Sequence, residues 1–124
     1  MRGKYFFAAA VLIVVFVYIM YKYAINGALY MTADEARAKI AAKEFDTIVD
    51  VRTNMEYNLG HAPDAVHLPI GEIKAKASSV LPDKTARILV YCNTGQRARA
   101  ASETLYSMGY KNVRYIGGTY LSLR

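Results

Sequence analysis

The stretch LVYCNTGQRARA, residues 89–100, determines how the rest of the chain is interpreted. Its apolar first half, together with the two residues before it, predicts a buried β-strand over residues 87–91. The strand runs directly into Cys92, the only cysteine of the chain, and Gly95 and Arg97 follow within five residues. A strand, a glycine-containing loop and a new helix would place this thiol where the ligand sites of α/β proteins lie, beyond the carboxyl end of a strand.

Cys92 has two interpretations. A lone cysteine is most often a small buried hydrophobe. Alternatively it is a nucleophile, because a helix N-terminus, loop N–H groups and the nearby Arg97 and Arg99 would all favour the thiolate. The loop, its glycine and the two arginines favour the nucleophile. The loop after Cys92 comprises Asn93, Thr94, Gly95, Gln96 and Arg97, and its backbone N–H groups can converge on a ligand above the thiol.

Strands and helices alternate on both sides of this loop. Thr32 and Glu35 have the spacing of a capping box that opens a helix, and Gly109 is a natural end for the helix that follows the loop. The pattern predicts an α/β fold, a small parallel sheet flanked by helices. The predicted strands are residues 47–51, 65–68, 87–91 and 112–116, and the predicted helices are 32–42, a short one ending at Gly60, 70–81 and one from about residue 98 to 108.

The N-terminus is different. YFFAAAVLIVVFVYIMY, residues 5–21, is uncharged and almost entirely apolar. As a helix it would measure roughly 26 Å, close to the hydrocarbon thickness of a bilayer. The alternative is a cleaved signal peptide, but the apolar run is long for one and the cleavage positions after Ala24 and Ala28 are poor. We therefore expect residues 1–29 to be a membrane anchor, or an uncleaved signal, and residues 30–124 to be the globular domain.

The orientation of this single-pass anchor rests on few charges. Arg2, Lys4 and the terminal amine precede the apolar run, and Lys22, Arg37 and Lys39 follow it. The count is nearly balanced under the positive-inside rule. A short basic tip is more easily retained than translocated, so the expected location of the domain is extracytoplasmic.

Composition excludes several classes of protein. A chain of 124 residues has room for one ordinary domain. The net charge of +6 is spread over a mixed surface without a long basic stripe, so no nucleic-acid partner is expected. One cysteine excludes an internal disulfide framework and a multi-thiolate zinc cluster, and His61 and His67 are too isolated to indicate a metal site.

Three segments together resemble a known family. DVRTNMEYNLGHAPDAVHLP (50–69), VYCNTGQRA (90–98) and VRYIGG (113–118) resemble a single rhodanese domain, and the resemblance covers residues 32 to about 121. It implies that Cys92 takes a sulfane sulfur from a donor such as thiosulfate, as a persulfide, and passes it to cyanide, a thiol or a protein acceptor. It also implies that the amides of residues 93–97 hold that sulfur, and that no metal or organic cofactor is required.

The resemblance implies roles for further residues. Arg52 and Glu56 are expected to pair as scaffold, and His61 to be a turn residue bonded to backbone rather than a catalytic base. Arg97 is expected to provide a fixed cation for thiosulfate and sulfite. Two departures from the family pattern are Ala98, where many members have a small hydroxyl residue, and a missing tryptophan after the glycine pair, a space for Tyr120 or Leu121.

Two other functions stay open. One is a membrane-tethered persulfide carrier or binding module with little turnover. The other is an arsenate- or phosphate-processing enzyme, since related domains in the cell-cycle dual-specificity phosphatases share the architecture. Those phosphatases place five residues between cysteine and arginine, whereas CNTGQR places four between Cys92 and Arg97. The shorter loop favours sulfur transfer.

Overall fold

The computed structural model describes residues 2–124. All strands are parallel and form one sheet in the order β2-β1-β3-β4. Each predicted strand is confirmed, with ends that differ by one residue at most. The strands are β1 (Thr47–Asp50), β2 (Val66–His67), β3 (Ile88–Tyr91) and β4 (Val113–Tyr115).

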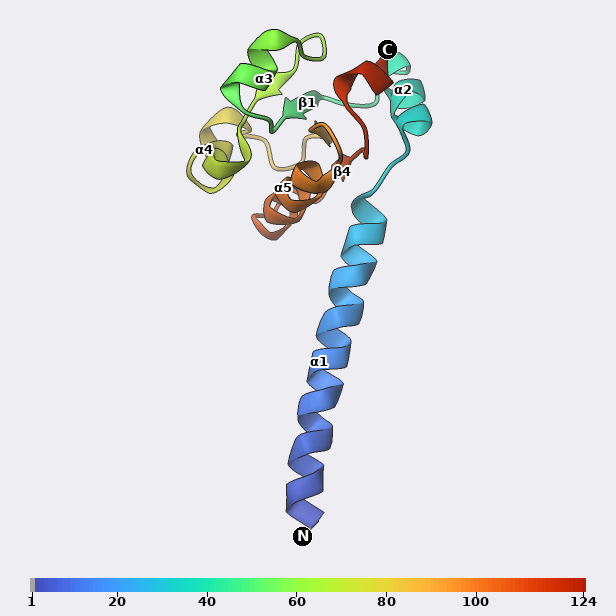
Figure 1. Ribbon diagram of the computed structural model, residues 1–124, viewed down its shortest axis with the longest axis vertical. Helices are drawn as coiled ribbons and strands as arrows, with labels where there is room; N and C mark the ends of the chain where they lie inside the picture. The colour runs from blue at the N-terminus through green and yellow to red at the C-terminus, as the bar shows by residue number, and fades with distance from the viewer. Residues whose placement is uncertain (1) are drawn as a thin grey trace.

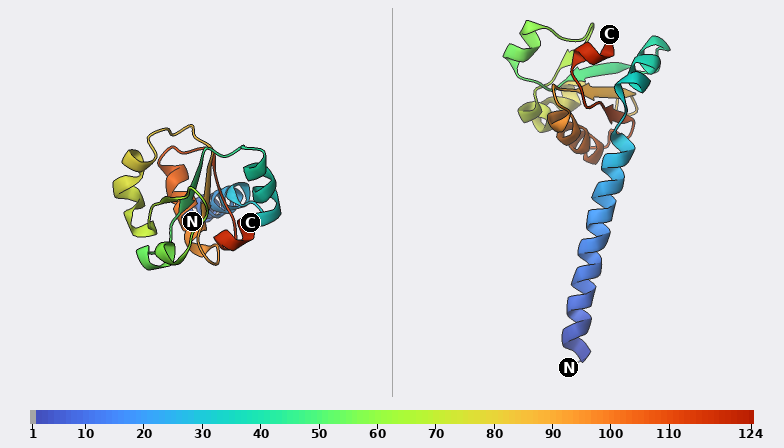
Figure 2. Two further views of the ribbon diagram at one scale, coloured as in Figure 1. Left: turned by 90° about the horizontal axis from the view of Figure 1, so that it is seen from above. Right: turned by 45° about the vertical axis from the view of Figure 1, so that its right-hand side comes forward.

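Short helices connect the strands and cover the sheet on both sides (Figure 2). Two of them begin with a threonine cap: the Thr32 side chain accepts a hydrogen bond from the Glu35 amide, and Thr53 and Glu56 form a complete capping box. The helices are α2 (Ala33–Ala41), α3 (Asn54–Leu59), α4 (Ile73–Val80) and α5 (Gln96–Ser107), with 3₁₀ turns η1 (Ile70–Glu72) and η2 (Tyr120–Leu123).

The central strand β3 divides the core into two parts. Ile88 and Val90 face a cluster that includes α4 and α5, while Leu89 and Tyr91 face a second cluster under α2 and η2. All four side chains are fully buried, as the period of two along a strand requires when both faces are covered. The chain therefore reaches Cys92 from the most enclosed strand of the sheet.

Turn η2 closes the second cluster. Tyr120 packs against this cluster and its ring centroid lies 5.2 Å from the guanidinium carbon of Arg52, whereas Leu121 is 53% exposed. Of the two candidates for the space of the missing tryptophan, Tyr120 is the residue that packs inward.

Helix α1 (Arg2–Leu29) projects away from the sheet as a long single helix (Figure 1). Residues Gly3–Ala24 are long and apolar enough to cross a membrane, and none of this stretch is buried against the domain. Large apolar side chains such as Phe6 and Phe16 are exposed along it. A helix that is apolar on every face requires an apolar surrounding, which this domain does not provide.

The end of α1 is joined to the domain without a free linker. Leu29 is buried in the first core cluster, and the next residue, Tyr30, forms a parallel bridge with Tyr115 beside β4. The Met31 amide donates to the Tyr115 carbonyl at 2.9 Å. Lower on the helix, Lys22 Nζ lies 3.6 Å from Glu103 Oε2 on α5. The end of α1 is therefore held against β4 through Tyr30 and Met31, and against α5 through Lys22.

Candidate active site

Cys92 lies at the carboxyl end of β3, next to the carboxyl end of β1. Its neighbours in the sheet are fixed by the pairing of Tyr91 with Asp50, the last residues of those two strands. The chain leaves β1 toward β2 on one side and leaves β3 toward β4 on the other. This is the point of an open α/β sheet where ligand sites form.

Two backbone amides point at the thiol. The Gly95 amide donates to Cys92 Sγ at 3.1 Å and the Ala98 amide at 3.4 Å. The Gly95 amide lies at the N-cap of α5 and the Ala98 amide in its first turn, where amides lack partners inside the helix. They stabilise negative charge on the sulfur, and the N-terminus of the twelve-residue α5 adds to the effect. The side chain of Cys92 is fully buried in this cradle.

Gly95 shapes the cradle in a way that other residues do not allow. It is the N-cap of α5 and has φ of 93°, in the left-handed region. A Cβ at this position would lie 2.8 Å from the Cα of Gly117, in the segment after β4. The loop therefore packs backbone against backbone, which keeps its amides turned toward the sulfur.

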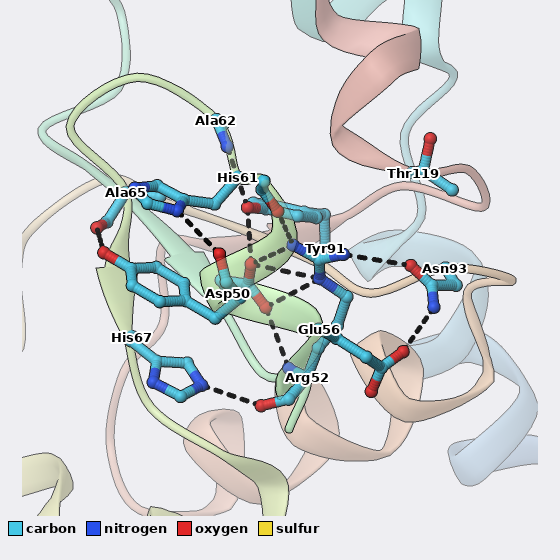
Figure 3. A network of polar contacts seen from close by, with 12 residues as sticks. Asp50, Arg52, Glu56, His61, Ala62, Ala65, His67, Tyr91, Asn93 and Thr119 are labelled. Carbon is cyan, nitrogen blue, oxygen red and sulfur yellow. Dashed lines mark hydrogen bonds and ion pairs between the residues drawn. The ribbon is translucent and has the colours of Figure 1, made fainter. Parts of the chain in front are cut away.

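A buried ion pair stands behind the loop. Arg52 Nη2 donates to Asp50 Oδ2 at 2.8 Å and to the Gly60 carbonyl at 2.6 Å (Figure 3). Burial opposes the charge of Arg52, but its hydrogen bonds to Asp50 outweigh that effect and raise its pKa. The Tyr91 hydroxyl also donates to Asp50 Oδ2, at 2.6 Å. Burial and this hydrogen bond raise the pKa of Tyr91 above its usual range, so the phenol stays protonated.

The predicted pairing of Arg52 with Glu56 is wrong. Glu56 instead holds Arg97 in a bidentate ion pair, with Nη1 to Oε1 at 2.7 Å and Nη2 to Oε2 at 2.9 Å. The hydrogen bonds from Arg97 and from the Thr53 amide hold the pKa of Glu56 well below its ordinary value. Arg52 pairs instead with Asp50, two residues before it in the chain. The Glu56 carboxylate is therefore available to Arg97 of the cysteine loop.

Asn93 joins the two ion pairs. Its side-chain amide donates to Glu56 Oε2, and its Oδ1 accepts from Arg52 Nη1 at 3.4 Å (Figure 3). One continuous polar network therefore runs from the end of β1 through α3 to the cysteine loop. Of the predicted loop residues, Asn93 and Arg97 belong to this network and Gly95 contacts the thiol.

Thr94 and Gln96 are exposed and make no hydrogen bond to the thiol. They line an open cavity of about 230 Å³ with Tyr30, Arg99, Tyr115 and Gly117. Arg99 has no carboxylate within ion-pair distance among residues 2–124, so its charge is not balanced locally. Larger cavities lie elsewhere in the described part of the chain, two near Phe45 and one between α1 and α5, and none of these three includes a loop residue.

The two histidines stack on one tyrosine and not on the thiol. The rings of His61 and His67 lie 3.8 Å and 4.3 Å from that of Tyr57. His61 Nδ1 bonds the Tyr57 carbonyl at 2.9 Å, which confirms the predicted hydrogen bond to backbone. His67 Nε2 donates to the Arg52 carbonyl at 2.8 Å, a support that the sequence analysis did not anticipate.

Sequence reasoning missed several parts of the site. The amide of Ala98 lies one residue beyond the predicted loop. Glu56 carried a signal that was overlooked: Thr53 and Glu56 have the same capping-box spacing as Thr32 and Glu35. For Tyr91, by contrast, a place in a buried strand gave no indication that its hydroxyl would reach Asp50.

Comparison with known proteins gives a consistent result. The model of the family described as "Rhodanese-like domain" matches residues 32–122. The chain is 37% identical over 70 residues to thiosulfate sulfurtransferase PspE of Escherichia coli. The aligned region covers 56% of this chain and 67% of PspE. The chain is 32% identical over 77 residues to "Putative sulfur carrier protein YrkF" of Bacillus subtilis, covering 62% of this chain but 40% of YrkF.

A solved structure supports the same fold. The rhodanese-like domain of the Anabaena protein Alr3790 superposes with a TM-score of 0.68 at 30% identity, covering 77% of this chain and 72% of that one. The family match begins at residue 32, so α1 lies outside it.

Proposed function

This chain belongs to the rhodanese-like domain family, and on that premise we propose that it is a sulfurtransferase in which Cys92 carries the sulfur as a persulfide. The observation that supports this most is the pair of amides, from Gly95 and Ala98, aimed at Cys92 Sγ. Such a cradle stabilises a thiolate before reaction and a terminal persulfide sulfur afterwards. Similarity to PspE, a thiosulfate sulfurtransferase, supports the same reaction class.

The reaction has two steps. The Cys92 thiolate attacks the outer sulfur of thiosulfate; a new S–S bond forms, and the bond to the sulfonate sulfur breaks with its electron pair leaving on sulfite. In the second step cyanide or a thiolate acceptor attacks the outer sulfur of the persulfide. Thiocyanate or an acceptor persulfide leaves, and the Cys92 thiolate returns. Each step exchanges one bond to sulfur for another and needs no external oxidant or reductant.

The loop residues have separate parts in this proposal. The backbone of residues 93–97 surrounds the transferred sulfur, and Gly95 makes that backbone geometry accessible. Arg97 fixes the loop through Glu56 and presents its remaining exposed edge to the sulfonate of the donor. Because Glu56 balances the charge of Arg97, the unbalanced cation nearest the loop is Arg99, which lines the cavity beside Gly95.

The test is intact mass spectrometry of the full chain in detergent, first after thiosulfate and then after cyanide. We expect a gain of one sulfur atom that cyanide reverses. The Cys92→Ser variant should gain nothing. No gain with thiosulfate or with a persulfide donor would contradict the proposal, and arsenate and aryl phosphates would then be tried as substrates.

A persulfide carrier is the second candidate. It is favoured by the complete burial of Cys92 and by the similarity to YrkF. A buried outer sulfur reacts slowly with free cyanide but is released when a protein acceptor opens the loop. The mass experiment distinguishes the two, because a carrier gains the sulfur atom and loses it only to a thiol or protein acceptor.

We also propose that α1 anchors the chain in a membrane, with the domain on the extracytoplasmic side. The exposed apolar surface of Gly3–Ala24 supports the anchor. The orientation rests on Arg2 and Lys4, a short basic tip before the span. A reporter fused after Arg124 tests the orientation, since activity of a reporter that functions only in the cytoplasm would contradict it.

A further inference from the structure

The apolar stretch of α1 ends close to the domain. Residues Gly3–Ala24 would extend about 33 Å along a helix, slightly more than a hydrocarbon core of about 30 Å. If this stretch spans the bilayer, as the proposed anchor requires, Tyr21 and Lys22 lie at the boundary between hydrocarbon and headgroups. Tyrosine and lysine are residues that favour that boundary.

The domain is already in contact with α1 at this level. Lys22 pairs with Glu103 on α5, and these two residues line a crevice of about 290 Å³ between α1 and α5. The rest of the crevice is formed by Tyr21, Tyr106, Ser107 and Lys111. In Figure 1, α5 lies at the edge of the domain that faces along α1. The carboxyl end of α5 therefore lies at the height of the headgroup layer, not above it.

The chemistry of this end suits an anionic, amphipathic surface. The Lys111 ammonium lies 4.0 Å from the ring centroid of Tyr106 and donates to the Tyr106 carbonyl at 3.2 Å. Lys84 Nζ reaches the same end of α5 through the Met108 carbonyl, at 2.8 Å. Glu103 balances only one of these cations, that of Lys22. Ammonium groups beside tyrosine rings bind lipid phosphates while the rings enter the interface.

We propose that the carboxyl end of α5, with Lys22 and Lys111, is a docking surface for anionic phospholipid headgroups. This inference rests on the proposed membrane anchor and goes beyond it, because an anchor alone does not require the domain to bind anionic headgroups. Lipid phosphates contact the ammonium groups of Lys22 and Lys111, and the rings of Tyr21 and Tyr106 lie at the level of the glycerol backbone.

Docking in this way has a consequence for the reaction. The cysteine loop is at the amino end of α5, opposite the docking surface. The thiol therefore stays on the water side of the domain, where an anionic donor such as thiosulfate is not repelled by lipid phosphates.

The test uses the absence of tryptophan from the chain. Three variants of the full chain, each with one tryptophan, are reconstituted in vesicles of phosphatidylcholine with or without phosphatidylglycerol. Phe16→Trp reports the span, Tyr106→Trp the docking surface, and Met55→Trp the exposed side of α3, which Figure 1 places far from α1. Lipids brominated near the headgroup quench tryptophan only at the membrane. Ser107→Trp replaces Tyr106→Trp if that variant does not fold.

We expect quenching of the Phe16→Trp and Tyr106→Trp variants and none of Met55→Trp. Phosphatidylglycerol should increase quenching of Tyr106→Trp, and salt of about 1 M, where charges are screened beyond about 3 Å, should remove that increase. Adding Lys111→Glu to Tyr106→Trp should lower the quenching. Lys43→Glu, the same charge change in the exposed turn after α2, should not.

Each contrary result has its own meaning. Quenching of Phe16→Trp without quenching of Tyr106→Trp overturns the docking surface and leaves the anchor in place. No quenching of Phe16→Trp overturns the anchor as well. Quenching of Tyr106→Trp that ignores both phosphatidylglycerol and Lys111→Glu would mean contact without recognition of anionic headgroups, which also overturns the proposal. A Tyr106→Trp signal that depends on protein concentration in detergent would assign the surface to a second copy of the chain.

Discussion

Among single residues of the site, Glu56 connects the start of α3 to the cysteine loop. It completes the capping box of α3 with Thr53, accepts from Asn93 and holds both terminal nitrogens of Arg97. Its carboxylate therefore has a local role, at the start of the short helix α3. It also makes a long-range contact, with Arg97, which lies 41 residues farther along the chain. Loss of this carboxylate would therefore loosen the cysteine loop without touching Cys92.

We predict that Glu56→Gln lowers the rate of sulfur uptake. It should also make the free energy of unfolding less dependent on pH in the acidic range. The folded pKa of Glu56 lies below its ordinary 4.5, so its stabilising effect is complete above pH 4.5 and is lost as the pH falls from there toward the folded pKa. Because the pair of Glu56 with Arg97 is partly exposed, the unfolding free energies of the unmodified chain and of Glu56→Gln should differ by about 1 kcal/mol or less at pH 7.

Melting curves of the full chain and of Glu56→Gln, recorded between pH 7 and pH 3, would check this. Their difference should be constant near neutral pH and should shrink below 4.5. Glu72→Gln, which breaks an exposed pair with Lys76 far from the loop, is the control and should leave sulfur uptake unchanged. A difference that grows on acidification would show that the assigned contact is wrong.

The close approach of Gly95 to Gly117 should make the reaction sensitive to a side chain at residue 95. Gly95→Ala adds a Cβ 2.8 Å from the Gly117 Cα and forces an L side chain to a φ of 93°, at a cost of about 1–2 kcal/mol. The loop relieves the clash by moving its amides away from Cys92. A displacement of about 1 Å at a reacting group costs roughly 10²-fold in rate, so sulfur transfer should fall far more than stability.

The matched control is Gly71→Ala, since a Cβ there meets nothing within 4 Å. Rates of thiocyanate formation and melting temperatures of both variants give the comparison. Equal activity of Gly95→Ala and the unmodified chain would mean that the backbone contact with Gly117 does not shape the cradle.

At the scale of elements, α5 links the reaction site to the core. Its buried face, Ala98, Ala101, Ser102 and Leu105, is made of small residues near the loop and a larger one farther along, so the helix lies close to the sheet where it supports Cys92. Ser102 does not fit this apolar face. Its side chain is fully buried, and its Oγ has no hydrogen-bond partner among the residues described.

We predict that Ser102→Ala stabilises the protein. It removes a buried hydroxyl without a partner and introduces the residue with the best helix propensity, together about 1 kcal/mol in unfolding free energy. For a domain of this size that is a rise of about 4–8 °C in melting temperature. Ser107→Ala is the control, because its hydroxyl is exposed and bonded to the Thr104 carbonyl at 2.7 Å. A fall in melting temperature for Ser102→Ala would mean that this hydroxyl has a partner in solution.

At the scale of the whole molecule, the order of elements and the position of the thiol could be predicted from the sequence. Periodicity and breaker residues are local signals, and they located every strand of the sheet. The partner of each charged side chain is not a local property. Arg52, Glu56 and Arg97 were recognised as important, but their pairing depends on where α3 places Glu56 relative to the end of β3. Cys92 was likewise predicted at the right strand end, while its complete burial follows from its packing in the first core cluster.

The junction of α1 with the domain supports a prediction at this scale. Leu29 belongs to the helix but is buried in the core with residues of α4 and α5. Leu29→Ala should lower the unfolding free energy by about 2–5 kcal/mol, as for other buried leucines. Leu12→Ala, on the exposed part of α1, should leave it unchanged. Thermal unfolding of both variants in detergent provides the measurement, and equal melting temperatures would show that the anchor and the domain are independent.

The same junction limits which acceptors the protein can serve. A catalytic domain on a flexible tether sweeps a volume set by the length of that tether. Here Leu29 is buried and Tyr30 is paired with Tyr115, so there is no such tether to extend. With α1 in a bilayer, the cysteine loop moves by lateral diffusion at one fixed height. An acceptor protein whose receiving thiol lies at that height meets it at a high effective concentration, and one whose thiol lies well above it does not meet it at all.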